Sequence, residues 1–410
     1  MFQPKAVAPG GRGSATNPHN RFEKLAIELE PEALVDEDGQ PIRPRTQFLR
    51  DDSQSIVSYN NSPDIPFAAG LNPYRGCEHG CAYCFARPFH EYLGFSSGLD
   101  FETKIVVKEN APELLRAELS RKKWVPQVLT MSAISDAYQP VERRLQLTRR
   151  CLAVLAEFRN PVGIITKNHL VTRDIDYLSE LARYHAATVS ISITSLDPEL
   201  AKTLEPRASP PSRRLAAIEE LSAAGIPVNA MTAPIIPGLN DHELPDLLAA
   251  AAQAGARSAG FTVLRLPYAV APLFVEWLER HAPGHKDKVL SRICSMRGGK
   301  LYDAKWGARM KGEGFFAEQI KALFHLGYRK AGFRGEIPEY DVSHFRVRSA
   351  FPLRGLSDDP VVNDGPRKAR KSTKRRQPLS CLFVYFVDQS PMLGFPQCIQ
   401  QCKERGVSDR

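Results

Sequence analysis

Hydrophobic and polar positions change their period repeatedly along the central part of the chain. From about residue 67, short runs of β-branched and small apolar residues alternate with longer stretches in which apolar residues recur every three to four positions. The first pattern is typical of strands and the second of amphipathic helices, so their alternation predicts βα units around a parallel sheet. We expect six strands, at residues 68–72, 127–133, 162–166, 187–194, 227–233 and 259–264.

A helix-period stretch follows each expected strand. Crossover helices of this kind cover a parallel sheet whose strands are buried on both faces, as in an open doubly wound sheet or in a barrel. Six βα units are expected, and a cysteine-rich loop of the kind that binds a metal follows the first strand. This combination favours an α/β fold built as a partial (β/α)6 TIM-like barrel. The expected helices cover residues 111–122, 142–158, 174–184, 211–224, 241–254 and 271–281.

The segments outside this alternating region differ from it in composition. Residues 1–64 are rich in glycine, proline, asparagine and other turn residues, which predicts an N-terminal extension that is partly flexible. The core barrel is expected at residues 65–282 and a helical C-terminal addition at 283–350. Residues 351–410 are expected to form a basic, disordered tail, although the apolar stretch LSCLFVYFVDQ within it has no physical explanation.

Composition and charge narrow the picture further. A hydrophobic content of 43% rules out wholesale disorder. The formal net charge of +9 suggests an acidic partner such as nucleic acid. However, the segment PRKARKSTKRR at 366–376 holds seven cations and no acid, which leaves +2 for the other 399 residues. The charge therefore indicates a basic segment rather than a basic protein body.

Neither a leader nor a membrane segment is expected. The first twenty residues carry proline, glycine and asparagine where a secretory leader would have an apolar region, so we expect a cytoplasmic protein. The longest unbroken apolar run, residues 381–387, is far shorter than the ~18 residues that a membrane span needs.

Three of the eight cysteines lie within eight positions, directly after the first expected strand. Cys77, Cys81 and Cys84 form a Cys-x3-Cys-x2-Cys array whose thiolates can converge on one metal centre. A tetrahedral zinc site needs a fourth ligand, and no second cysteine pair lies nearby, although His79 sits between two of the cysteines. Three thiolates also suit a [4Fe-4S] cluster that leaves one iron open for substrate. Both interpretations remain open at this level.

The cysteine spacing, placed after the first strand of a six-unit βα chain, resembles the cluster-binding motif of the radical S-adenosylmethionine (SAM) superfamily. The longer string YRGCEHGCAYC resembles the spore photoproduct lyase-like group, often described as DNA repair photolyases, and the resemblance covers residues 67–282. It implies an enzyme in which a reduced [4Fe-4S] cluster splits SAM into methionine and a 5′-deoxyadenosyl radical. It also implies a flavodoxin- or ferredoxin-like electron donor.

The resemblance further implies SAM contacts at the carboxyl ends of the strands. Tyr83, the aromatic residue before the last cysteine, would lie beside the adenine, and Asp136 would bind the methionine amino group. Arg207 would neutralise the methionine carboxylate. Lys167 would neutralise either the same carboxylate or the reduced cluster. The ribose contacts would come from Ser192, Thr194 and Asn229.

Four of these candidates also have an ordinary structural interpretation. Asp136 can cap a turn before the next helix, and Lys167 can be a solvated loop residue. Ser192 and Thr194 can occur in a strand because of β-propensity alone.

The substrate is open between a nucleic acid, a peptide and a small molecule. The lyase-like chemistry would use a cysteine outside the cluster as hydrogen-atom donor, but Cys151 lies in an apolar helical stretch typical of a core and Cys294 gives no signal. Arginines 143, 144, 149 and 150 form either a solvated helix face or a nucleic-acid contact. The competing hypothesis is a zinc-stabilised nucleic-acid-binding module without radical chemistry.

Overall fold

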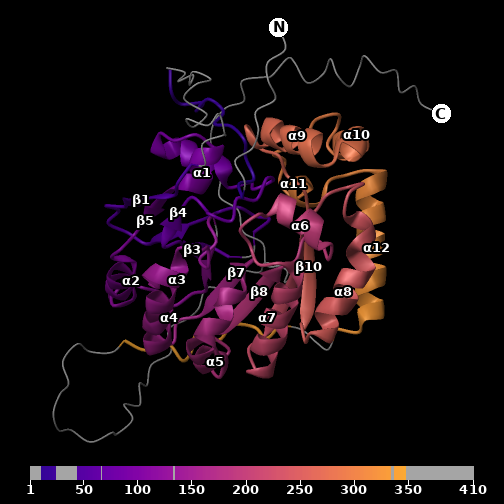
Figure 1. Cartoon of the computed structure of the whole chain (residues 1–410). Helices are drawn as coiled ribbons and strands as arrows, with labels where there is room; N and C mark the ends of the chain where they lie inside the picture. Colours follow the sequence, from indigo (N-terminus) through magenta and orange to yellow (C-terminus); the bar gives the residue numbers. More distant parts are fainter. Residues whose placement is uncertain (1–10, 25–43, 66, 133, 334–336, 348–410) are drawn as a thin grey trace, which may run out of the picture.

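The six expected parallel strands are present and lie side by side in chain order. The computed structural model describes residues 11–24, 44–65, 67–132, 134–333 and 337–347 (Figure 1). All neighbouring pairs among the six strands are parallel. Successive crossover connections produce this arrangement, so the predicted α/β fold with a partial barrel is confirmed. The strands are β3 (Ala69–Leu71), β6 (Leu129–Met131), β7 (Val162–Thr166), β8 (Ala187–Ser192), β9 (Val228–Ile235) and β10 (Ser258–Val263).

Further strands lie outside the predicted set. β2 (Val57–Tyr59) pairs antiparallel with β3 and extends the main sheet to seven strands. A second sheet of three strands has the order β1 (Gln47–Arg50), β5 (Lys104–Val107), β4 (Tyr74–Arg75). Strands β4 and β5 stand before and after the cysteine loop and pair with each other, so the second sheet fixes both ends of that loop.

The helices agree with the predicted ones in place, and they differ mainly at their ends. The helices that follow the strands are α2 (Ala111–Leu119), α3 (Glu142–Leu145), α4 (Leu147–Phe158), α5 (Ile175–Ala182), α7 (Pro211–Ala223), α8 (Leu244–Gln253) and α9 (Val270–His281). The expected helix at 142–158 is interrupted because Gln146 has a φ of 51°, a left-handed conformation that an α-helix does not accommodate. The short helix α6 (Pro198–Leu204) was not predicted; Asp197 caps it by accepting hydrogen bonds from two backbone N–H groups.

Shorter and peripheral helices complete the described chain. They are the 3-10 helices η2 (Arg87–Leu93), η3 (His169–Asp174), η4 (Asp241–Glu243) and η5 (Pro283–His285), and the α-helices α1 (Leu99–Thr103), α10 (Lys286–Ser295), α11 (Ala308–Lys311) and α12 (Phe315–Ala331). Helix α12 lies along α8 (Figure 1). Within the described ranges, no helix combines the length and the apolar character that crossing a bilayer requires.

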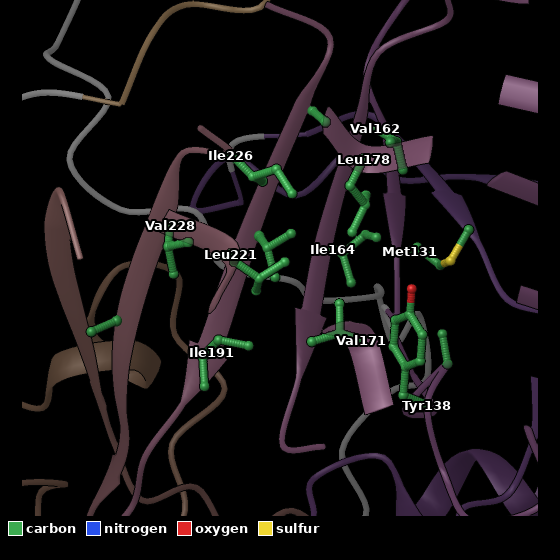
Figure 2. Packing of buried hydrophobic residues seen from close by; sticks show 14 of the residues in the cluster. Met131, Tyr138, Val162, Ile164, Val171, Leu178, Ile191, Leu221, Ile226 and Val228 are labelled. Atoms are coloured by element: carbon green, nitrogen blue, oxygen red, sulfur yellow. The ribbon is translucent and has the colours of Figure 1, made fainter. Parts of the chain in front are cut away.

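The two faces of the main sheet have different chemistry. Val162 and Ile164 of β7 face the helices and pack with Leu178 of α5 in the largest apolar cluster (Figure 2). The alternate positions face the barrel interior, because successive side chains of a strand point to opposite sides. On β8 the alternate positions are Thr188, Ser190 and Ser192, and Ser192 lines the cavity described below. The barrel therefore has an apolar outside, and small residues such as Ser192 and Ala233 line part of its interior.

The last described segment, residues 337–347, runs under the amino ends of the strands (Figure 1). The backbone N–H of Asp341 donates to the His185 carbonyl at 3.2 Å, and that of Arg346 donates to the Phe158 carbonyl at 2.9 Å. The Tyr340 hydroxyl hydrogen-bonds to Thr188, an interior position two residues before Ser190. This segment closes the end of the barrel opposite to the cysteine loop.

Helix α11 connects the two ends of the main sheet. It contacts β10, while Arg309 forms an ion pair with Asp64, which lies between β2 and β3, at an Nε to Oδ2 distance of 2.8 Å. Met310 packs with Ile65 and Phe67 in a small apolar cluster beside the ion pair. The polar and apolar contacts together cover the side of the barrel where the sheet does not close on itself.

Residues 11–20, which the composition predicts as part of a flexible arm, pack against the back of the cysteine loop. The backbone N–H groups of Gly13 and Ser14 donate to the two carboxylate oxygens of Glu102 at 3.0 and 2.9 Å. Glu102 is fully buried and also accepts from Arg87, whose guanidinium donates to the Cys81 carbonyl at 2.9 Å. The N-terminal segment is thereby connected to a cysteine through two buried side chains.

We expect Gly13→Ala to destabilise the protein, because an added Cβ would lie 1.7 Å from the Gly80 carbonyl oxygen. Overpacking of this kind costs about 1–3 kcal/mol. Thermal unfolding and limited proteolysis of residues 11–20 would measure the effect. Gly284→Ala is the control, since nothing lies within 4 Å of its added Cβ. Equal melting temperatures for the two variants would contradict the described packing.

Candidate functional site

An open cavity lies at the carboxyl ends of the parallel strands. The cysteine loop forms one wall, and the ends of β6 to β10 form the others. The carboxyl end of the strands is where α/β barrels place their chemistry. The polar and thiol side chains at the wall are those of Cys77, His79, Cys81, Tyr83, Cys84, Ser132, Ser135, Asp136, Thr166, Lys167, Ser192, Thr262 and Arg265.

All three predicted cysteine ligands line this cavity. Cys77 and Cys81 are each 7% exposed, and the loop between them turns back at Gly80, which has a φ of 66°. A Cβ at Gly80 would lie 2.6 Å from a Glu102 carboxylate oxygen, so the loop needs glycine there for both conformation and space.

Burial raises the pKa of each of the three thiols above its ordinary value, and for Cys77 the nearby Asp136 carboxylate raises it further. A metal centre must therefore displace protons from these thiols when it binds. In the part of the chain that the structure describes, no group of three or more His, Cys, Asp or Glu side chains is arranged to hold a single metal ion. The donor set itself, three thiols along one cavity wall, fits three corners of an iron–sulfur cluster.

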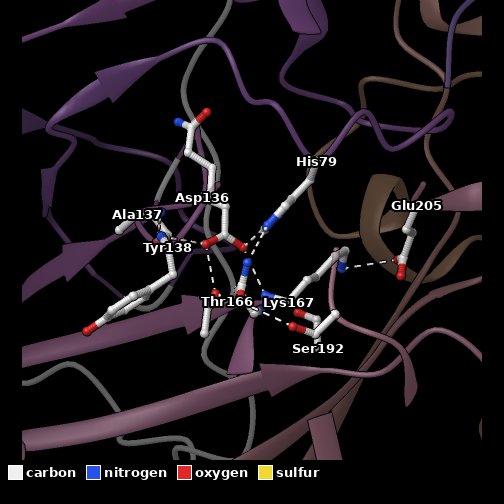
Figure 3. Close-up of polar contacts among 12 residues, drawn as sticks. His79, Asp136, Ala137, Tyr138, Thr166, Lys167, Ser192 and Glu205 are labelled. Atoms are coloured by element: carbon white, nitrogen blue, oxygen red, sulfur yellow. Dashed lines mark hydrogen bonds and ion pairs between the residues drawn. The ribbon is translucent and has the colours of Figure 1, made fainter. Parts of the chain in front are cut away.

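Asp136 is the centre of a buried hydrogen-bond network (Figure 3). Its carboxylate accepts from the Thr166 hydroxyl at 2.7 Å and from the Lys167 backbone N–H at 2.8 Å. His79 approaches the same carboxylate with Nδ1 at 3.3 Å, while Asn168 contacts the other ring nitrogen at 3.1 Å. Burial alone raises the pKa of Asp136, but His79 and these hydrogen bonds outweigh it, so the pKa lies below its usual range. Asp136 is therefore held as a carboxylate at the cavity wall.

His79 supports the cysteine loop from inside the protein. Its side chain is 1% exposed and faces Asp136 (Figure 3). The contact ties the loop between Cys77 and Cys81 to the end of β6.

Glu205 organises a second buried network on the other side of the cavity. Its carboxylate accepts from the hydroxyls of Tyr83 and Thr194 and forms an ion pair with Arg214. Lys167 extends toward it with Nζ 3.7 Å from Oε1 (Figure 3). Burial raises the pKa of Glu205, but the Arg214 and Lys167 charges and the two hydroxyls outweigh it and lower that pKa to about 2.

Arg214 connects this network to the barrel. It is 1% exposed and donates to the Ser192 carbonyl at 3.0 Å and to the Ser209 carbonyl at 2.6 Å. The end of β8, the loop before α7 and the ring of Tyr83 are consequently fixed by one buried ion pair.

The structure brings together four of the seven predicted SAM-contact residues. Tyr83, Asp136, Lys167 and Ser192 line the cavity with the cysteines. The other three lie elsewhere: Thr194 hydrogen-bonds to Glu205 behind the wall, and Arg207 pairs with Glu78 at 3.0 Å. Asn229 is at the amino end of β9, where its amide accepts from Ser258 at 2.8 Å and approaches Ser190 at 3.4 Å.

Sequence reasoning missed the buried charges behind the wall. Glu205 lies two residues before Arg207, which the family resemblance implied as a SAM contact. The Glu205 carboxylate accepts a hydrogen bond from Tyr83, whereas Arg207 forms an ion pair with Glu78. Arg214 lies on an amphipathic helix, where an arginine gives no signal of burial. Only a contact between elements distant in the sequence distinguishes such residues from surface charges.

The remaining described cysteines lie away from the cavity wall. Cys151 is fully buried in the apolar cluster under α4, as its helical pattern predicts, and Cys294 is on α10. The tail cysteines and the basic segment 366–376 fall outside the described residues. Of the four arginines on α3 and α4, Arg149 is ion-paired with Asp174 and Asp176.

A partial βα barrel with a three-cysteine loop at its mouth is the architecture of radical SAM proteins. Residues 71–251 match the family model described as the Radical SAM superfamily. This part of the chain is therefore similar to the radical SAM superfamily.

Two curated relatives are similar to part of this chain. The uncharacterized protein Rv2578c of Mycobacterium tuberculosis is 39% identical over 225 residues, which are 54% of this chain and 66% of that protein, slightly under two thirds of its length. The uncharacterized protein MJ0683 of Methanocaldococcus jannaschii is 33% identical over 173 residues, 42% of this chain and 62% of that protein.

Solved structures of spore photoproduct lyase share the fold. One complexed with dinucleoside spore photoproduct superposes with a TM-score of 0.52 at 13% identity, over 77% of this chain and 86% of that chain. A variant with bound AdoMet and dinucleoside spore photoproduct gives 0.52 at 14% identity, over 77% and 86% of the two chains. At this identity the likeness concerns the fold.

We expect Glu205→Ala to destabilise the protein strongly, because it leaves the Arg214 guanidinium buried without its carboxylate. Removing one partner of a buried ion pair costs about 3–5 kcal/mol. Urea unfolding would show the loss as a lower midpoint. Glu199→Ala is the matched control, since Glu199 pairs with Lys202 on the surface, where such a pair contributes little. A midpoint for Glu205→Ala equal to that of the control would refute the assigned role.

Proposed function

We propose that Cys77, Cys81 and Cys84 hold a [4Fe-4S] cluster with one open iron, and that the enzyme uses it to cleave SAM reductively. The observation that carries this proposal is the convergence of three thiols and four candidate SAM contacts on one cavity. A bound cluster would supply the electron that splits the sulfonium C–S bond and yields a 5′-deoxyadenosyl radical.

The residues of this chain would bind and orient SAM against the cysteine loop. Asp136 is held as a carboxylate and suits the methionine ammonium. Lys167 extends into the cavity and suits the methionine carboxylate. Ser192 offers a hydroxyl to the ribose, and the Tyr83 ring, held through its hydroxyl, offers a face to the adenine.

Thr194, Arg207 and Asn229 stay predictions from the resemblance. The hydrogen bond from Thr194 to Glu205 supports an indirect role, in which it holds the group that orients Tyr83. The contacts of Arg207 and Asn229 run to other residues of the protein.

A substrate from the nucleic-acid class follows from the group resemblance and from the shared fold with a lyase that was complexed with a dinucleoside photoproduct. A flavodoxin- or ferredoxin-like electron donor and a cytoplasmic location complete the proposal. The basic segment 366–376 would add sequence-independent contacts to such a substrate.

We expect the anaerobically reconstituted protein to be brown, to bind about four irons and, with a reductant, to convert SAM to 5′-deoxyadenosine. Cys81→Ala should lose both the colour and the cleavage, because it removes one of three ligands. Cys151→Ala is the control, since this thiol is buried under α4 away from the cavity. Iron analysis, absorption spectra and product chromatography provide the readouts. A colourless, zinc-loaded protein without cleavage would support the zinc-module alternative instead.

We expect Lys167→Met to weaken SAM binding by about tenfold or more, because a charge-assisted hydrogen bond is lost. The iron content should be unchanged, since Lys167 is not a cluster ligand. Equilibrium dialysis with SAM would measure the affinity. Lys202→Met, which removes an exposed cation on α6, should bind SAM like the wild-type protein. Equal affinities for the two variants would exclude Lys167 from the SAM site.

A further inference from the structure

The wall of the cavity formed by the end of β10 has no role in the SAM contacts proposed above. Those contacts come from the cysteine loop and from the ends of β6, β7 and β8. In the sheet, β9 separates β8 from β10, and its lining residues Met231 and Ala233 are apolar. Two polar residues of the β10 wall, Thr262 and Arg265, lie beyond this apolar strip.

Arg265 is a buried cation at this wall. It is 7% exposed, and its guanidinium carbon lies 5.5 Å from the ring centre of Phe85, the residue after Cys84. One of its Nη atoms donates to the Tyr302 hydroxyl at 3.4 Å. The guanidinium therefore lies beside the cysteine loop and within 6 Å of the centres of two aromatic rings, a setting that favours arginine over lysine.

The backbone that carries Arg265 is fixed from two sides. The preceding residue, Leu264, donates its N–H to the Ile235 carbonyl at 2.9 Å, and its own carbonyl accepts from Arg297 at 2.8 Å. Arg297 is itself 4% exposed. Arg265 thus projects from a preorganised strand end rather than from a loop that must reorder when a ligand binds.

Thr262 provides an independent sign of a polar ligand on the same wall. Its side chain faces the barrel interior and is 4% exposed, yet no described residue forms a hydrogen bond with its hydroxyl oxygen. A buried hydroxyl without a partner costs about 1–3 kcal/mol, so a bound group that supplies the partner is favoured there.

We propose that the β10 wall is the substrate subsite, where Arg265 binds a carboxylate or phosphate group of the substrate and Thr262 adds a hydroxyl contact. This inference rests on the proposed function, because it assigns the other walls of the cavity to SAM. A planar guanidinium binds either oxyanion through two parallel hydrogen bonds, and a buried position strengthens them. Binding the anionic group at the rim of the cysteine loop would place the adjoining carbon atoms of the substrate over the SAM side of the cavity. Neutral and cationic compounds lack the group that this subsite recognises.

The test is a calorimetric titration of the reconstituted, SAM-saturated full-length protein with inorganic phosphate, with acetate and with choline. We expect saturable binding of at least one of the two anions and none of choline. Arg265→Gln should weaken anion binding by about tenfold or more, Arg265→Lys should do so less, and Thr262→Val by about threefold. Arg116→Gln, which removes an exposed cation paired with Glu157, should bind like the wild type. Tighter binding of phosphate identifies a phosphate-bearing substrate, and tighter binding of acetate a carboxylate.

Iron content and SAM affinity, measured on the same samples, separate the two proposals. Both should be unchanged in Arg265→Gln. A parallel loss of SAM affinity would assign Arg265 to the SAM site and overturn the inference, as would anion affinity equal to the wild type or the absence of anion binding by the wild-type protein. If the wild-type protein takes up no iron and cleaves no SAM, the titrations are repeated on that protein. Arg265-dependent anion binding would then stand while the proposed function fails.

Discussion

The ion pair between Glu205 and Arg214 is the interaction on which the geometry of the cavity depends. Both side chains are almost fully buried, so neither charge can be solvated by water and each requires the other. Arg214 also donates hydrogen bonds to backbone carbonyls of β8 and of the loop before α7. Glu205 also accepts a hydrogen bond from the Tyr83 hydroxyl, so one ion pair positions the cysteine loop relative to the sheet.

A second buried ion pair positions the cysteine loop from its opposite side. Arg87 and Glu102 are both fully buried, and Arg87 also donates to the Cys81 carbonyl. Glu102 accepts the two N–H groups of the N-terminal segment, which therefore belongs to the support of the loop. The cysteine loop is irregular, and buried carboxylates replace the regular backbone hydrogen bonds that would hold a strand or helix in place.

Small side chains in the interior of the barrel explain why a cavity exists there. Large aliphatic side chains fill the interior of many parallel barrels, which makes it a packed core. Here β8 presents Ser190 and Ser192 inward, and Tyr340 from the end of the described chain reaches Thr188 from below. The interior is thus closed at the amino ends of the strands and open at the carboxyl ends, where the thiols and the charged residues lie.

The sequence by itself determined the βα order and the cysteine loop, and it indicated the superfamily that residues 71–251 match. Periodicity is local, and the spacing of Cys77, Cys81 and Cys84 within one loop is local as well, so both can be read without tertiary information. Asp136, Lys167 and Ser192 lie at or after strand ends, which parallel strands bring to one edge, whereas Tyr83 was indicated by its place in the cysteine motif. Only the tertiary structure decided that Glu205 and Arg214 are buried, that Arg207 faces Glu78, and that residues 11–20 pack against the loop. The physical reason is that burial and pairing of a charge depend on residues far away in the chain, about which local composition carries no information.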